Sequence, residues 1–431
     1  MVKPGYKQTE VGVIPEEWEV CAWEAAGSCF SSGATPCRAI SRYFDGEIKW
    51  VSSGELNHNI IIDTLEHISK EAQEENNLVI HPANTFLMAI TGLEAAGTRG
   101  SCAILGVPAT TNQSCMAVYG TEKLDVKYLF YYYSAKGDDL AFKYCQGTKQ
   151  QSYTAGIVKK LPIILPPIDE QKKIAAALSD VDKLINTLNR QYAKKKAIKQ
   201  GAMQELLTGK KRLPGFIREW QHFIFGELFN FIPNNAFTRA QMSESGKVKN
   251  IHYGDILTKY GAYVNGSSDS IPYISKDVDL ARFADRCYLQ SGDIIMADTA
   301  EDETAGKVLE VVNVDCPILA GQHTLLCRPK VRFAPKFLGY YLNAACYHDQ
   351  LIPYIVGTKV SSVSKASVAQ TELVVPDYEE QQAIAEILSN MDSGIEALER
   401  KLAKYRQVKQ GMMQQLLTGK IRLTKNEEGL E

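Results

Sequence analysis

The chain has 431 residues, a net charge of −2, and apolar and charged fractions of 45% and 23%. This length suits two domains with connecting helices, and the composition is that of a globular protein that is not a basic nucleic-acid binder overall. We expect a cytoplasmic protein with reduced thiols and no zinc site, because it lacks a membrane-spanning run, an apolar signal core and any C-x-x-C pair among its ten cysteines.

The dominant feature of the sequence is an internal repeat at an offset of 210 residues. Aligning 169–213 with 379–423 gives 24 identities in 45 positions without a gap. Weaker matches extend upstream, where Gly147-Thr148-Lys149 recurs as Gly357-Thr358-Lys359. The repeat predicts two copies of one unit, each a globular head followed by a long helix.

The two heads, 1–165 and 214–375, differ greatly in sequence, but both are typical of a mixed α/β (α+β) fold with many short strands. Gly and Asn separate the β-prone runs, as turns require. The β-prone runs that we match between the heads are 48–52 with 271–275 and 85–90 with 293–297. The apolar runs 128–134 and 337–344 fit either a helix or a strand.

Each head is followed by an amphipathic helix that begins after prolines and ends before a glycine. Pro166-Pro167 and Pro376-Asp377 mark the starts, and Gly209 and Gly419 occupy C′ positions. Apolar residues recur in steps of three and four, the heptad pattern of a coiled coil. The predicted helix-pairing residues are Ile174, Leu178, Val181, Ile185, Leu188, Tyr192, Ile384, Leu388, Met391, Ile395, Leu398 and Leu402. Lys195, Lys199 and Lys409 also occupy this seam, so we expect it to loosen there or the lysine stems to snorkel.

Each helix has one apolar stripe, and its nearest candidate partner is its own copy. A two-fold relation between the copies predicts an antiparallel two-helix coiled coil, a spacer for the two heads. The alternative is that each helix packs on its own head as an ordinary amphipathic element. The predicted segments are 1–165 (first head), 166–213 (first spacer helix), 214–375 (second head), 376–423 (second spacer helix) and 424–431 (charged tail).

The charge of the helical segments is uneven. Segment 169–213 carries a net charge of +6, whereas its copy 379–423 carries +1. A strip that binds DNA phosphates in the same way should be basic in both copies. The asymmetry therefore favours a solvated helix face over a phosphate-binding strip.

These motifs resemble the specificity (S) subunit of a type I DNA restriction–modification system. The resemblance rests on T-E-V-G-V-I-P-E-E-W at 9–18, on G-T-K near the end of each head, on the [D/E]-E-Q helix start and on the helix end Q-x-L-L-T-G-K-x-R-L. It covers roughly residues 5 to 423, and the duplicated order of the parts is specific to that family.

The resemblance implies a non-catalytic DNA-binding subunit. Its heads would be target recognition domains that each read one half of a bipartite sequence in double-stranded DNA. Its helices would form the antiparallel spacer and dock two methyltransferase (M) subunits, and through them restriction (R) subunits. S-adenosylmethionine, ATP and Mg would then be bound by those partners, with no cofactor and no metal in this chain.

Catalytic motifs do not appear in the residues themselves. The sequence has no phosphate-binding G-x-x-x-x-G-K-[ST] loop and no Asn-Pro-Pro-[Tyr/Phe] motif of an adenine methyltransferase. Glu170-Gln171-Lys172 matches the E-x-K of a nuclease site, but its copy, Glu380-Gln381-Gln382, lacks the lysine. We expect both glutamates to favour the positive end of a helix. The alternatives are a coiled-coil adaptor that binds proteins and, less favoured, a degenerate enzyme.

Base readout needs hydrogen-bonding side chains, and loops after matched strands are the natural positions for them. The candidates in the first head are Ser52, Ser53, Arg99, Asn112, Gln113, Lys149, Gln150 and Gln151. Those in the second head are Ser275, Lys276, Lys307, Gln322, His323, Lys359 and Ser361. Any one of them could be an ordinary turn residue, but as sets they recur at equivalent places.

Overall fold

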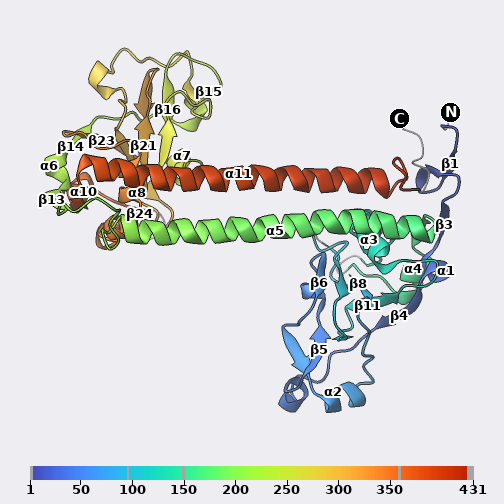
Figure 1. The fold of residues 1–431 in the computed structure, drawn as a ribbon. Coiled ribbons are helices and arrows are strands. Elements are labelled where there is room, and N and C mark those ends of the chain that lie inside the picture. The colour runs from blue at the N-terminus through green and yellow to red at the C-terminus, as the bar shows by residue number, and fades with distance from the viewer. Residues whose placement is uncertain (1–2, 95–96, 148–150, 358–360, 425–431) are drawn as a thin grey trace. The chain divides into compact units, whose positions relative to one another are not determined.

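A computed structural model of the protein describes residues 3–94, 97–147, 151–357 and 361–424. The chain divides into two compact units, Met1–Leu188 with Lys401–Glu431, and Asn189–Arg400. Each unit therefore contains one head and a part of each of the two long helices (Figure 1). All ten cysteines are free thiols.

The first head consists of short strands and mostly short helices. Its strands are β1 Tyr6–Thr9, β2 Gly12–Pro15, β3 Glu19–Ala22, β4 Ser28–Ser32, β5 Ile48–Val51, β6 Asn59–Ile61, β7 Glu66–Ile68, β8 Phe86–Ala89, β9 Cys102–Leu105, β10 Thr110–Thr111, β11 Cys115–Tyr119 and β12 Pro162–Leu165. Its helices are α1 Trp23–Ala26, η1 Ser41–Phe44, η2 Ser53–Glu55, α2 Lys70–Glu75, α3 Val126–Tyr144 and α4 Ala155–Lys160.

The second head follows the same order with small insertions. Its strands are β13 Gln221–Ile224, β14 Phe229–Ile232, β15 Met242–Ser243, β16 Lys249–Ile251, β17 Tyr263–Asn265, β18 Tyr273–Ile274, β19 Ile294–Ala297, β20 Thr299–Ala300, β21 Val308–Val312, β22 Ile318–Ala320, β23 Thr324–Pro329, β24 Ser361–Ser362 and β25 Glu372–Val375. Its helices are α6 Phe225–Leu228, η3 Arg239–Gln241, α7 Tyr253–Thr258, η4 Asp285–Cys287, α8 Phe337–Leu342, α9 Ala345–His348, η5 Ile352–Tyr354 and α10 Lys365–Ala369.

Both heads have the same sheet topology. The main sheet has the strand order β4-β11-β8-β9-β6 in the first head and β14-β23-β19-β21-β17 in the second. A smaller sheet contains β10-β5-β7 in the first head and β22-β16-β18 with β15 in the second. The predicted mixed α/β heads are thus confirmed, and the ambiguous runs 128–134 and 337–344 lie mainly in helices α3 and α8.

Each head has its own apolar core around the central strand of the main sheet. In the first head all four residues of β8 are buried, and Trp23, Phe86 and Tyr133 meet edge to face with ring centroids 5.6 to 6.0 Å apart. In the second head β19 is likewise fully buried, and Phe225 stacks on Phe229. Strands buried on both faces explain why these runs are continuously apolar.

The two long helices are α5 (Ile168–Leu206) and α11 (Tyr378–Leu416), each of 39 residues. At 1.5 Å per residue each helix is about 60 Å long. Both begin directly after the predicted proline-containing segments. After the last helical turn, Gly209 and Gly419 adopt φ angles of +67° and +70°, which confirms the predicted left-handed C′ glycines.

Within each unit the segments of α5 and α11 run antiparallel. In the first unit Asp182 pairs with Lys409, and Glu170 pairs with Arg422, so the residue number falls on α5 as it rises towards the end of α11. In the second unit Tyr192 donates to Glu399, and Lys199 pairs with Asp392. The predicted antiparallel pairing of the two helices is therefore confirmed inside each unit.

Seam residues of the long helices also enter the cores of the heads. Ile174 and Leu178 belong to the core of the first head together with Leu416 and Leu417. The repeat-equivalent residues Ile384 and Leu388 belong to the core of the second head together with Leu206 and Leu207. Further along, Ile185, Leu188, Ile395 and Leu402 are buried, whereas Val181, Tyr192, Met391 and Leu398 are half-buried. The helix ends thus pack on the heads as well as on each other.

Among the described residues, none of the helices has the length and apolarity to cross a bilayer. The same residues contain no group of three or more His, Cys, Asp or Glu side chains that could hold a metal ion.

Candidate nucleic-acid interface

In the first head, two parallel strands end side by side and bring predicted reading residues together. Strands β5 and β10 pair in parallel, with Val51 opposite Thr111. The amide of Asn112 donates to the carbonyl of Val51 over 2.9 Å. The segments that follow, Ser52-Ser53 and Asn112-Gln113, therefore share one edge, which we call the first strand-end edge.

Part of the hydrogen-bonding capacity of this edge is already used within the chain. The Ser52 side chain and Glu55 form a capping box at the start of η2. The Asn112 side-chain oxygen accepts a hydrogen bond from the amide of Ser114 over 3.0 Å. Gln113 Oε1 accepts one from the hydroxyl of Thr35 over 2.6 Å, at an exposed position. The Gln113 amide nitrogen is thus the group on this edge that is best placed to donate outward.

Arg99 and Gln151 both make hydrogen bonds to Glu94. Arg99 pairs with Asp138 over 2.8 Å, and its side chain is 16% exposed. The Gln151 amide donates to the carboxylate of Glu94, whose backbone carbonyl accepts from Arg99. Arg99 is therefore held by internal partners, and its predicted role in DNA binding remains a prediction.

In the second head, the equivalent parallel pair is formed by β16 and β22. The counterpart of β5 is therefore β16, and not the β-prone run at 271–275. The amide of Gly321, just after β22, donates to the carbonyl of Ile251, the last residue of β16, over 2.8 Å. Gln322-His323 therefore share an edge with His252-Tyr253, which we call the second strand-end edge. It is the structural equivalent of the first strand-end edge.

Ser275 and Lys276 lie elsewhere, so our matching of 48–52 with 271–275 was wrong. They follow β18, which runs antiparallel to β16, so they lie towards the opposite end of that sheet. An insertion before β18 shifts the second head out of register with the first. Two short β-prone runs that look alike were therefore matched, although they are not equivalent strands. His252 and Tyr253 were missed for this reason.

The other candidates of the second head fall into two groups. Ser361 pairs with Ala300 where strands β20 and β24 run side by side. Strand β20 starts directly after Asp298, whose carboxylate lies 3.8 Å from the imidazole of His323, so Ser361 is connected to the second strand-end edge. Lys307 instead donates to the carbonyls of Leu257 and Tyr260. Burial lowers the pKa of Lys307. Its ammonium is therefore held by carbonyl groups at the end of α7. The predicted role of Lys307 in DNA binding remains a prediction.

Three predicted residues, Lys149, Gln150 and Lys359, lie outside the described residues. The glycines that precede them, Gly147 and Gly357, have φ angles of +106° and +140°, a conformation that favours glycine.

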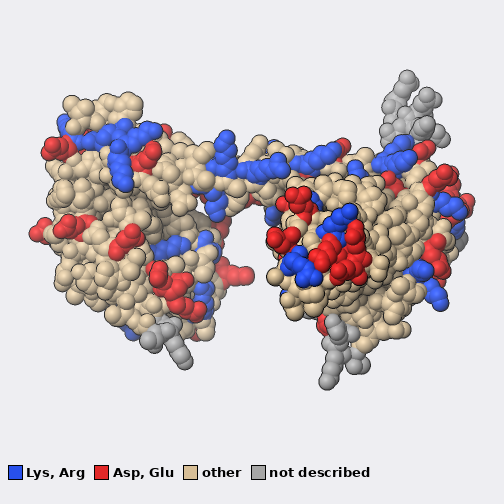
Figure 2. Space-filling model, turned by 90° about the horizontal axis from the view of Figure 1, so that it is seen from below, with Lys and Arg blue, Asp and Glu red and all other residues tan. Residues whose placement is uncertain are grey.

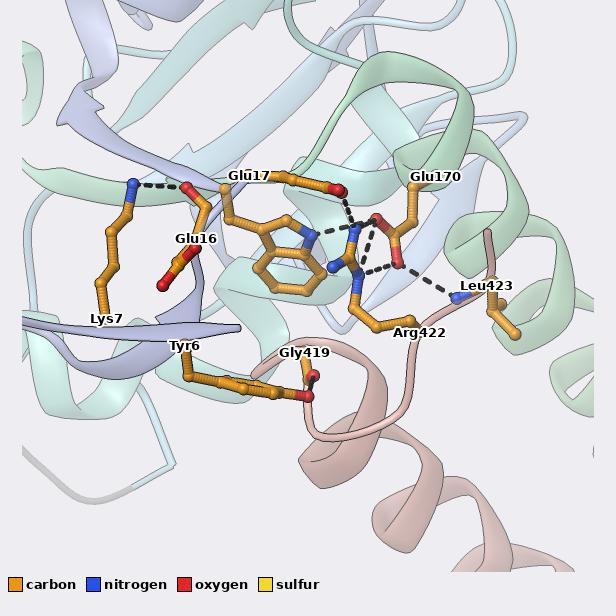
Figure 3. Close-up of polar contacts among 9 residues, drawn as sticks. Tyr6, Lys7, Glu16, Glu17, Glu170, Gly419, Arg422 and Leu423 are labelled. Atoms are coloured by element: carbon orange, nitrogen blue, oxygen red, sulfur yellow. Dashed lines mark hydrogen bonds and ion pairs between the residues drawn. The ribbon is translucent and has the colours of Figure 1, made fainter. Parts of the chain in front are cut away.

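The Glu-Gln pair that opens each long helix joins that helix to the segment after the other one. In the first unit Arg422 donates through Nε and Nη2 to the two carboxylate oxygens of Glu170, each over 2.9 Å, and Leu423 and Glu17 complete the group (Figure 3). Trp18 Nε1 donates to the same carboxylate. The main partner of the glutamate is thus an arginine. The attraction to the positive end of the helix, which we expected for it, adds to this ion pair as a smaller effect.

The second unit contains the same junction. Arg212 donates to Glu380 over 2.7 and 2.6 Å, and Trp220 Nε1 donates to it over 3.1 Å. Gln171 and Gln381 also have matching roles, because each donates to the carbonyl of the proline five residues earlier. These identities of the repeat are therefore explained by the fold rather than by a nuclease site.

A second repeated group pairs the seam lysines. Lys409 forms an ion pair with Asp182, which also accepts a hydrogen bond from the hydroxyl of Tyr131. In the second unit the same three roles belong to Lys199, Asp392 and Tyr340. The charges of Lys199 and Lys409 are thus neutralised by partners on the facing helix and the head, whereas Lys195, the third seam lysine, is exposed.

One cluster in the first unit places a cysteine thiol beside an imidazole, as nucleophilic sites do, but the thiol is buried. Cys102 Sγ lies 3.4 Å from His58 Nδ1 and 3.5 Å from Ser134 Oγ. Burial raises the pKa of the Cys102 thiol to about 12 and lowers that of His58. The thiol therefore stays protonated, and the thiolate is the reactive form.

Charge on the visible face is mixed. Lys and Arg side chains lie along the long helices, and both acidic and basic clusters lie on the heads (Figure 2). On this face of the described residues, neither head presents a purely basic surface of the kind that binds DNA by charge alone.

The two heads have equivalent folds, and their polar strand-end edges do not carry the same set of side chains. Each head is followed by one copy of a duplicated long helix. These features define a two-headed recognition protein. The chain belongs to the family of type I restriction modification DNA specificity domains, which matches residues 15–200 and 217–405. This confirms the resemblance to specificity subunits that the motifs indicated.

Known relatives and a solved structure are similar to this chain over different lengths. The type I restriction enzyme MjaVIII specificity subunit of Methanocaldococcus jannaschii is 26% identical over 429 residues, covering 95% of this chain and 94% of the relative. The EcoR124I/EcoR124II specificity subunit of Escherichia coli is 26% identical over 186 residues, covering 42% of this chain and 44% of the relative. The crystal structure of a type I S subunit from M. genitalium has the same fold, with a TM-score of 0.58 at 13% identity, covering 96% of this chain and 98% of that one.

Proposed function

We propose that this chain reads a bipartite DNA sequence, with one half-site contacted by each head. The observation that carries the proposal is the pair of strand-end edges. They occupy equivalent places in two heads of one topology. Ser52, Ser53 and Asn112 on one edge correspond to His252, Tyr253 and Gly321 on the other, whereas Gln113 and Gln322 are the same residue type. Equal scaffolds with unlike hydrogen-bonding groups suit two different base sequences.

The duplicated helices suit two identical protein partners. Arg190, Lys194 and Gln204 are exposed on α5, and the repeat places Arg400, Lys404 and Gln414 at the same exposed positions on α11. Exposed residues contribute little to the core, so their identity in both copies favours a shared external role. We infer that each copy docks one methyltransferase subunit, since two like faces bind two like partners.

Catalysis would then be supplied by the partners. The methyltransferase subunits would bind S-adenosylmethionine and methylate adenine at N6, and restriction subunits bound through them would use ATP and Mg. A methyltransferase that reaches a base inside a duplex must extrude it, so the bound DNA should be distorted near each head. The present chain would contribute sequence choice.

The net charge of −2 and the mixed surface favour weak DNA binding by this chain alone. Phosphate contacts provide most of the affinity of DNA-binding proteins, and the partners would supply many of them. Discrimination between sequences would still reside in the two heads.

The direct test is selection of random-sequence DNA by the complex of this chain with its methyltransferase, followed by sequencing of the bound fraction. Enrichment of a two-part motif with a constant gap supports the proposal. Exchange of residues 214–370 for another head should then change one part of the motif and leave the other intact. Binding without any enriched motif, or capture of a protein ligand by the heads, would favour the adaptor function instead.

A further inference from the structure

The second strand-end edge carries a compact aromatic and amide cluster that the sequence repeat did not reveal. The rings of Tyr253 and His323 meet edge to face, with centroids 5.4 Å apart and planes at 81°. The Gln322 amide nitrogen lies 3.2 Å from Nε2 of His323. These three side chains come from two segments that are brought together by the pairing of β16 with β22.

Two neighbouring residues, His252 and Asp298, hold the rings of this cluster in place. His252 is buried and accepts a hydrogen bond from the amide of Gly254 through Nδ1, which caps the first turn of α7. Its ring lies 4.5 Å from that of Tyr253. The His323 ring lies 3.8 Å from the Asp298 carboxylate on its other side. These contacts position the rings of Tyr253 and His323, and both ring nitrogens of His323 face a partner, Nε2 the Gln322 amide and Nδ1 the Asp298 carboxylate.

Two observations indicate that this cluster is built for a ligand. His323 has a φ angle of +55°, a left-handed conformation that non-glycine residues adopt at a cost, and such residues concentrate at functional sites. The hydroxyl of Tyr253 makes no hydrogen bond to any residue in the described ranges 3–94, 97–147, 151–357 and 361–424. The His323 side chain is 47% exposed, and Tyr253 is half-buried.

We propose that Tyr253, Gln322 and His323 contact the base edges of the half-site read by the second head. The proposal rests on the proposed function and assigns one of its two reading surfaces. The phenol of Tyr253 donates to the N7 or O6 acceptors of purines. On DNA binding, Gln322 and His323 would exchange the hydrogen bond that they make with each other for bonds to base edges. Ser275 and Lys276, at the other end of the small sheet, make no base contact.

The equivalent edge of the first head has Ser52 and Ser53 where the second has His252 and Tyr253. Small hydroxyls allow a closer approach of the backbone to DNA, whereas a tyrosine and a histidine reach further from it. The two heads would therefore read unlike bases with the same framework, which is the property that a bipartite target requires.

The test uses the complex with the methyltransferase and sequencing of the DNA that it selects from a random pool. The variants Tyr253→Phe, Gln322→Ala and His323→Asn are compared with the unmodified chain. Asn tolerates the left-handed backbone, so the last variant removes the imidazole without straining the loop. We expect preference at one or two positions of one half-site to fall by about tenfold, with the other half-site unchanged.

Two controls make the result decisive. Gln113→Ala, on the first strand-end edge, should relax the other half-site, and Lys276→Ala should leave both unchanged. The unaltered half-site in each complex shows that the variant is folded and assembled. Unchanged motifs for all three variants, or a motif altered by Lys276→Ala alone, would overturn the inference. If the unmodified complex selects no two-part motif, it is the proposed function that fails.

Discussion

Glu170 and Arg422 are 252 residues apart in the chain, yet their side chains form a two-bond ion pair in which Glu170 is almost completely buried. The repeat forms the same pair between Glu380 and Arg212. In each case the glutamate opens one long helix, and the arginine follows the other. The start of each helix is thereby attached to the end of its antiparallel neighbour, within one compact unit.

Removal of the arginine should destabilise the unit that contains it. Arg422→Met leaves the Glu170 carboxylate buried without its main partner, and we expect a loss of about 3 kcal/mol in the free energy of unfolding. Chemical denaturation followed by circular dichroism measures this loss. Lys420→Met changes an exposed neighbour and serves as the control. Equal stability of the two variants would show that the ion pair contributes nothing net.

Stability should fall in acid because of Glu170. Burial alone raises the pKa of this carboxyl, but the hydrogen bonds from Arg422, Trp18 and the Leu423 amide together lower it below the usual value of 4.5. A depressed pKa in the folded state contributes stability above the unfolded pKa, and this contribution is lost as the pH falls through the folded pKa.

The measurement is the free energy of unfolding between about pH 6 and about pH 3, for the unmodified chain and for Glu170→Gln. The variant should show a smaller decrease over the acid part of this range, since residue 170 can no longer take up a proton. Asp169→Asn, which alters the exposed neighbouring carboxyl, is the matched control. Parallel curves for all three proteins would contradict the prediction.

The ion pair between Lys409 and Asp182 should couple the two long helices measurably. Both side chains are less than one-third exposed, and the Tyr131 hydroxyl fixes the carboxylate. A double-mutant cycle with Lys409→Met and Asp182→Asn should give a coupling energy of about 1 kcal/mol. The pair Lys183–Asp180, on the outer face of α5 and largely exposed, should give clearly less. A larger coupling for the exposed pair would contradict this prediction.

Glycines within and just after the long helices should respond to alanine in opposite directions. Gly419 has a left-handed backbone, and a Cβ there would fall on the ring of Pro15, so Gly419→Ala should destabilise the first unit. Gly209→Ala should cost less, because its Cβ would meet Trp220 at an ordinary 3.4 Å. Gly411 lies inside α11 with open space around it, and Gly411→Ala should stabilise by about 0.5 kcal/mol. Melting temperatures of the three variants rank these effects, and a destabilising Gly411→Ala would contradict the last one.

Much of the frame could be predicted from the sequence because the repeat and the heptads are long and regular. The starts of α5 and α11, the left-handed glycines and the antiparallel pairing all depend on local signals that appear twice. The junction of Trp18 with Glu170 was missed although both residues recur in the second copy, because a hydrogen bond across 152 residues has no local signal. The matched pair of heads was partly misaligned, because short β-prone runs do not specify which strand they pair with.

The reading edges were the least predictable part. Asn112 and Gln322 were found because they follow strands that keep their spacing in both heads. Tyr253 follows β16, a strand of three residues of which two, Lys249 and Asn250, are polar, so no apolar run marks it in the sequence. Arg99 and Lys307 were predicted as hydrogen-bonding side chains in loops after matched strands, and the structure gives both of them internal partners.

The division of the chain has a consequence for its synthesis on the ribosome. The second unit is a single continuous stretch, Asn189–Arg400, whereas the first unit needs residues from 401 onward to complete its core through Leu416 and Leu417. The head that is translated first therefore has to wait, with part of its apolar surface uncovered, until nearly the whole chain has been made. The head that emerges later can close first, so the order of completion is the reverse of the order of translation.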